Sequence, residues 1–97
     1  MFAYQSCVAW LLKQTEELRN VGHKVEVKEN DILQQSVLLR ISSPRFEAEL
    51  LVRENGIANM IAFNVESHCY ELDRHDLILL DDTFRQELEV FFDLLRS

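Results

Sequence analysis

The sequence has few of the residues that mark irregular or covalently stapled proteins. Its 97 residues include two glycines, one proline and two cysteines, which argues against long irregular loops and against a disulfide framework. The longest apolar run near the N-terminus is Val8–Leu12, and no basic segment precedes it. That pattern fits neither a signal peptide nor a membrane span. We therefore expect a cytoplasmic protein whose two thiols are reduced and buried.

Basic residues are scarce in the last third of the chain. Eight acidic and seven basic residues lie between Met1 and Val65, whereas nine acidic and three basic residues lie between Glu66 and Ser97. With a net charge of −7, such a protein repels nucleic acid and anionic membranes and favours a basic protein partner. The simpler alternative is that the acidity only keeps a small protein soluble.

Helical periodicity is present at both ends of the chain. The first helix is expected over Phe2–Asn20, with Gly22 just beyond it as a stop signal. The last helix is expected after Thr83, which forms a capping-box pattern with Gln86. Asp81 and Asp82 suit the positive end of that helix dipole. The apolar stripes comprise Tyr4, Val8, Leu11, Leu12 and Leu18 in the first helix, and Phe84, Leu88, Phe91, Phe92 and Leu95 in the last.

The segment between the helices alternates with the two-residue period of strands. Asn55-Gly56 is typical of a hairpin turn, because these residues tolerate positive φ angles. A shorter fifth strand is expected where His68, Tyr70 and Leu72 alternate with Cys69, Glu71 and Asp73. The expected inward residues are Val25 and Val27, then Val37, Leu39 and Ile41, then Phe46, Ala48, Leu50 and Val52, and finally Ile57, Ile61 and Phe63.

Short polar turns between successive strands permit only antiparallel neighbours. The sequence therefore predicts one α+β domain over residues 1–97, with two layers: an antiparallel meander sheet of four to five strands, and both terminal helices packed on one face. Leu11, Leu50, Ile61 and Phe91 should be buried. The other sheet face should then present a mixed surface, comprising Leu38, Arg40, Glu47, Glu49, Leu51, Ala58, Met60 and Ala62.

The segment Glu66–Asp82 offers side chains that could serve chemistry, but their spacing disfavours it. His68 and Cys69 are adjacent, so on a strand they point to opposite faces and cannot easily bind one ion, even with Asp73, His75 and Asp76 nearby. A nucleophilic pair of Cys69 with His23, His68 or His75 is disfavoured because neighbouring carboxylates oppose a thiolate. The sequence also has no glycine-rich phosphate loop. We expect no catalytic residue, no metal and no cofactor.

Three stretches carry a family resemblance: "VAWLLKQTEEL" with Trp10 in the first helix, the hairpin "VRENGIANMIAFN", and the closing "FRQELEVFFDLL". Together with the layout and the acidity, they resemble the immunity proteins of bacterial polymorphic toxin systems, most closely the TriTu-type family. The resemblance spans the whole chain as a loose pattern. It implies a partner toxin that ADP-ribosylates elongation factor Tu.

The expected function is therefore stoichiometric neutralisation of a cognate toxin domain with a basic surface. The alternatives are a secretion chaperone that holds an effector segment, and a small enzyme that uses Cys69 or carboxylates. On the first interpretation, charged encounter residues surround an apolar centre. The candidate partner-binding residues are Glu66, Tyr70, Glu71, Asp73 and Asp76, with Leu51 and Met60.

Overall fold

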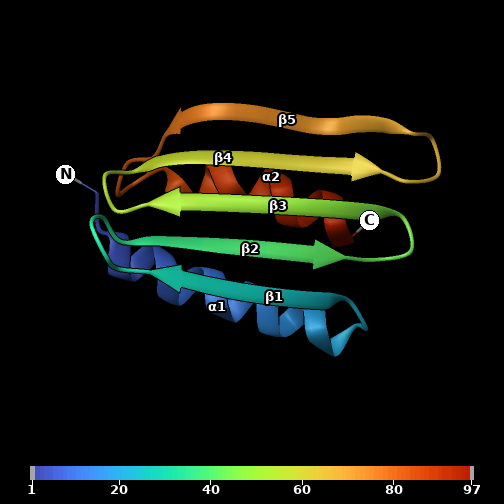
Figure 1. Ribbon diagram of the computed structural model, residues 1–97, viewed down its shortest axis with the longest axis horizontal. Coiled ribbons are helices and arrows are strands. Elements are labelled where there is room, and N and C mark those ends of the chain that lie inside the picture. The colour runs from blue at the N-terminus through green and yellow to red at the C-terminus, as the bar shows by residue number, and fades with distance from the viewer. Residues whose placement is uncertain (1, 97) are drawn as a thin grey trace.

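A computed structural model of the chain describes residues 2–96 and contains one open sheet and two helices (Figure 1). The strands lie in the order β1-β2-β3-β4-β5, each antiparallel to its neighbours. The predicted α+β meander is confirmed. The elements are α1 (Tyr4–Asn20), β1 (Lys24–Asn30), β2 (Ser36–Ser42), β3 (Phe46–Arg53), β4 (Ile57–Asn64), β5 (Cys69–Ile78) and α2 (Phe84–Arg96).

Both helices lie behind the sheet in Figure 1, α1 behind β1 and β2, and α2 behind β3 and β4. Their apolar stripes enter one hydrophobic core with the inward-facing residues of the sheet. Leu12 is the exception: it was expected in the stripe of the first helix, but it is 42% exposed. Leu11, Leu50 and Phe91 are completely buried in the core, as predicted. Trp10 links the two helices at the edge of this core, with its ring centroid 6.0 Å from that of Phe84. Neither helix is long and apolar enough to cross a membrane within residues 2–96.

The predicted Asn-Gly hairpin joins β3 to β4. Gly56 has a φ of +88°, and a Cβ atom on it would lie 2.8 Å from the carbonyl oxygen of Leu79. The Gly56 carbonyl in turn accepts a hydrogen bond of 2.8 Å from the amide of Leu79. Glycine is therefore required at this turn both by the backbone conformation and by the close approach of the chain that follows β5.

The predicted face of the fourth strand is wrong. Ala58, Met60 and Ala62 are fully buried in the core, whereas Ile61 and Phe63 are half-buried on the other face. Leu50 pairs directly with Met60, which fixes this register. In each alternating set of β4, three of the four residues are apolar, so periodicity alone could not choose between the two faces. One set contains Ile57, Ile61 and Phe63, and the other contains Ala58, Met60 and Ala62. The two alanines leave room for the large aromatic side chains of α2.

The fifth strand is longer than predicted and is irregular. Its register against β4 shifts twice, between Ala58 and Met60 and between Ala62 and Phe63. Because one of these shifts falls between Tyr70 and Leu72, these residues lie on opposite faces, and the predicted alternation is wrong. His68 precedes the strand in a turn with a φ of 58°. Bulges of this kind protect an edge strand from pairing with another chain.

The segment before α2 connects the two ends of the fold. The helix begins at Phe84, directly after Thr83, as the capping pattern predicted. The Asp81 carboxylate, however, accepts a hydrogen bond from the backbone amide of Ala3, at the start of α1. Asp81 therefore binds the residue that precedes α1, although it lies in the segment before α2.

The register of β4 can be tested by truncating two neighbouring side chains. Met60→Ala should lower the free energy of unfolding by about 2–5 kcal/mol, because it leaves a cavity in the core. Ile61→Ala, the matched control on the opposite face, should cost only about 1–2 kcal/mol. Urea denaturation of both variants measures the difference. A larger loss for Ile61→Ala than for Met60→Ala would contradict this register.

Candidate functional site

The sheet face without helices, which is turned toward the viewer in Figure 1, is the candidate site. We call it the open face. Antiparallel pairing brings its side chains together from four neighbouring strands. The open face comprises Leu38 and Arg40 of β2, Glu47, Glu49 and Leu51 of β3, Asn59, Ile61 and Phe63 of β4, and Tyr70, Asp73 and His75 of β5.

Two depressions lie on the open face and share Glu49 and Ile61. The first, of about 340 Å³, we call the Leu51 depression. The second, of about 290 Å³, we call the Tyr70 depression. Each is large enough for one apolar side chain of a partner. The Leu51 depression is lined by Leu38, Glu49, Leu51, Asn59, Ile61 and His75; the Tyr70 depression is lined by Arg40, Glu47, Ala48, Glu49, Ile61, Phe63 and Tyr70.

An aromatic pair borders the Tyr70 depression. The rings of Phe63 and Tyr70 are directly opposite across β4 and β5, with centroids 5.1 Å apart and planes at 67°. Tyr70 nevertheless remains 58% exposed. Aromatic side chains carry a large share of binding energy when a partner desolvates them. This pair is therefore the strongest candidate for an anchor on the open face.

Two pairs of polar side chains on the open face lie in close contact. Arg40 Nε lies 3.1 Å from Glu49 Oε1 on the adjacent strand, and His75 Nε2 lies 2.7 Å from Asp73 Oδ1. Exposed pairs of this kind contribute little to stability. The Arg40–Glu49 pair places opposite charges beside apolar groups, which is an arrangement suited to specific protein recognition.

The predicted carboxylates outside the open face lie along the exposed edge at β5 and the turn before it. Glu71 accepts a hydrogen bond from the Asn64 side chain, and Asn64 Oδ1 accepts the amides of Glu66 and Ser67 at 2.9 and 3.1 Å. Asp76, with a φ of 56°, donates its amide to Asn59 Oδ1 at 2.8 Å. Glu71 therefore helps to hold the turn, while Glu66 and Asp76 keep exposed carboxylates.

Of the seven predicted partner-binding residues, the structure places Leu51, Tyr70 and Asp73 together on the open face. Met60 was expected beside them, but it is fully buried under the helices and cannot meet a partner. The prediction for Met60 is wrong because the two faces of β4 were assigned the wrong way round. The larger neighbours Ile61 and Phe63 occupy the positions that Met60 was expected to share, and sequence reasoning had assigned both to the core.

The two cysteines have opposite environments, although both were expected to be buried. Burial raises the pKa of the Cys7 thiol to about 12, whereas Cys69 is exposed and its Sγ lies 3.5 Å from the carbonyl oxygen of Ser67. Neither takes part in a disulfide. Among residues 2–96, no group of three or more His, Cys, Asp or Glu side chains is arranged to hold a metal ion.

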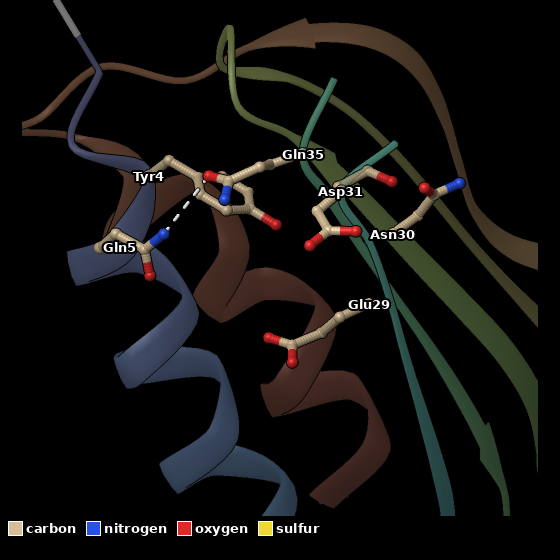
Figure 2. A pocket seen from close by; sticks show the side chains of 7 residues that line it. Tyr4, Gln5, Glu29, Asn30, Asp31 and Gln35 are labelled. Carbon is tan, nitrogen blue, oxygen red and sulfur yellow. Dashed lines mark hydrogen bonds between the residues drawn. The ribbon is translucent and has the colours of Figure 1, made fainter. Parts of the chain in front are cut away.

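Another hollow, of about 460 Å³, lies away from the open face, between the start of α1 and the β1–β2 turn (Figure 2). We call it the end notch. Burial, and then the charge of Glu29, raise the pKa of Tyr4 at this site. The sequence had identified Glu29, Asn30 and Asp31 only as a polar turn, because nothing local indicates that α1 lies beside them. Its lining is Tyr4, Gln5, Glu29, Asn30, Asp31, Gln35 and Ser36.

No family model, no curated protein and no solved structure matches the chain. The resemblance to TriTu-type immunity proteins therefore remains an expectation from the sequence.

The two thiols should differ sharply in reactivity. At pH 8 a thiol-specific reagent such as iodoacetamide should modify Cys69 and leave Cys7 intact, because Cys7 is inaccessible and, with a pKa of about 12, almost entirely protonated. Peptide mass spectrometry of the native protein measures both sites, and denatured protein is the control in which both should react. Rapid modification of Cys7 in the native protein would contradict its burial.

Proposed function

We propose that the chain is a cytoplasmic immunity protein that binds a bacterial toxin domain through the open face. Binding covers the active or substrate-docking surface of the toxin and leaves the toxin chemically unchanged. The observation that carries the proposal is an uncovered sheet face on which apolar side chains and fixed charges surround two depressions. The sequence resemblance adds the expectation of an ADP-ribosyltransferase toxin that acts on elongation factor Tu.

The size of the open face is consistent with this role. Together with the adjoining outer side of β1, the open face spans five strands, which at a spacing of about 4.8 Å are roughly 20–24 Å wide. A strand such as β3 is roughly 26 Å long. The projected area of this side of the sheet is therefore roughly 550 Å², and its accessible surface is larger because the side chains protrude. It approaches the roughly 800 Å² that each partner contributes to a standard interface. One face of this small domain is thus enough to occlude a toxin active site.

The charge of the chain indicates a basic partner. Glu66, Asp73 and Asp76 have exposed carboxylates along or beside β5, next to the depressions rather than inside them. Such carboxylates speed the encounter with a basic surface, while the desolvated apolar groups slow its dissociation. We call Glu66, Asp73 and Asp76 the acidic edge. In this division of roles, Phe63 and Tyr70 slow the dissociation of the complex, and the acidic edge speeds its association.

Titration of a toxin domain encoded beside this chain tests the proposal. With the toxin at a concentration far above the dissociation constant, its activity should fall linearly and end at about one equivalent of the immunity protein. Dilution of the complex should restore the activity of the toxin. After the complex is separated by denaturation, mass spectrometry should show a toxin of unchanged mass. Complete inactivation of the toxin by a small fraction of an equivalent of this protein would require catalysis and would contradict the proposal.

The steering role can be separated from the anchoring role by kinetics. The triple variant Glu66→Gln, Asp73→Asn, Asp76→Asn removes three charges and leaves Glu71, on which the Asn64 turn depends. Its association rate at low salt should fall by about tenfold, and the difference should shrink as salt rises. Tyr70→Ala is the matched contrast: it should mainly raise the dissociation rate. An association rate that stays unchanged at low salt would remove the acidic edge from the mechanism.

A further inference from the structure

The loop between β1 and β2 carries two fully solvated aliphatic side chains. Ile32 is 84% exposed and Leu33 is 98% exposed. We call these two residues the loop tip. They are more exposed than any other large apolar residue within positions 2–96. Single exposed aliphatic residues are common on protein surfaces, but two adjacent ones at the end of a loop form a small projecting patch.

The loop is held in place by its neighbours. The Ile32 amide donates to Asn30 Oδ1 at 3.0 Å. Gln35 and Glu54 exchange two bonds: the Gln35 amide donates to Glu54 Oε1 at 3.1 Å, and the Glu54 amide donates to the Gln35 carbonyl at 2.8 Å. Gln5 of α1 adds a side-chain bond of 3.3 Å to Gln35, drawn in Figure 2. These bonds fix both ends of the loop, which limits the backbone entropy that is lost when a partner binds its tip.

The surroundings of the loop tip select the kind of partner. The end notch lies directly beside it, and Glu29 and Asp31 bring carboxylates to its lining, which contains no basic residue. Glu54 adds a third acidic side chain where it meets Gln35. This acidic collar opposes insertion into an anionic lipid surface. It is complementary to a protein pocket with an apolar floor and a rim of lysine or arginine side chains.

The loop tip is also continuous with the open face. Ser36, the first residue of β2, pairs with Arg53, and Leu38 pairs with Leu51. The Leu51 depression therefore begins only two residues, or roughly 7 Å, along β2 from the end of the loop. A single partner that covers the open face can reach the tip without a second interface.

We infer that Ile32 and Leu33 insert into an apolar pocket of the toxin domain, and that a basic side chain on the rim of that pocket enters the end notch. The inference rests on the proposed function and extends its contact surface around the end of the sheet. The tip supplies desolvated anchors that hold the complex together. The notch supplies the charge pairing that fixes the orientation of the partner.

The double variant Ile32→Ser, Leu33→Ser tests the tip against the toxin domain that the wild-type protein inhibits. The dissociation constant should rise by about 30-fold or more, mostly through faster dissociation. Thermal stability should change little, since neither side chain is packed. Val21→Ser, Val90→Ser is the matched control: it removes two exposed aliphatic side chains, 68% and 46% accessible, at the end of α1 and on α2. Its affinity should equal that of the wild type.

The possible outcomes separate the two claims. If the wild type inhibits at about one equivalent and the tip variant binds equally well, the inference is wrong and the proposed function stands. If the wild type does not bind the toxin, the proposed function fails and the inference falls with it. Glu29→Gln, Asp31→Asn tests the notch: its affinity should drop more at low salt than at high salt. Co-sedimentation of the wild type, but not of the tip variant, with phosphatidylcholine–phosphatidylglycerol vesicles would identify a lipid anchor instead and overturn the inference.

Discussion

The packing of both helices against one side of the sheet determines the rest of this structure. Side chains of a strand alternate between faces, so each residue that meets α1 or α2 leaves its neighbours on the open face. Leu50 and Met60 are completely buried at the centre of the core, and this places Leu51 and Ile61 on the other side. The same register that stabilises the fold therefore builds the candidate binding surface.

The open face carries large apolar side chains that are not part of the core. Half-buried Leu38, Leu51, Ile61 and Phe63 lie near the Arg40–Glu49 ion pair and the contact between His75 and Asp73. Tyr70 adds an exposed ring. The edge of the sheet is protected at β5 by two register shifts and by charged side chains, which disfavour pairing with another strand. One face of the sheet is therefore left uncovered, while the β5 edge disfavours uncontrolled association.

The sequence was sufficient for the order of the elements, since helical and strand periods, the Asn55-Gly56 turn and Thr83 are all local signals. It was insufficient for the face of β4, where alternation is apolar on both sides and only the fit against Phe91 and Phe92 decides. The irregular register of β5 and the end notch depend on contacts between distant segments. Ile32 and Leu33 follow a polar turn and belong to no helical or strand periodicity. Their exposure could therefore be recognised only from the structure of the loop between β1 and β2.

The central claim is that the partner covers the open face and not the outer surface of the two helices. The most direct measurement is methyl NMR of isotope-labelled protein as unlabelled toxin domain is added. We expect the methyl signals of Leu38, Leu51 and Ile61 to shift or broaden as the complex forms, whereas those of Leu12 and Val90, exposed on the helices, stay in place. Perturbation confined to Leu12 and Val90 would contradict the account.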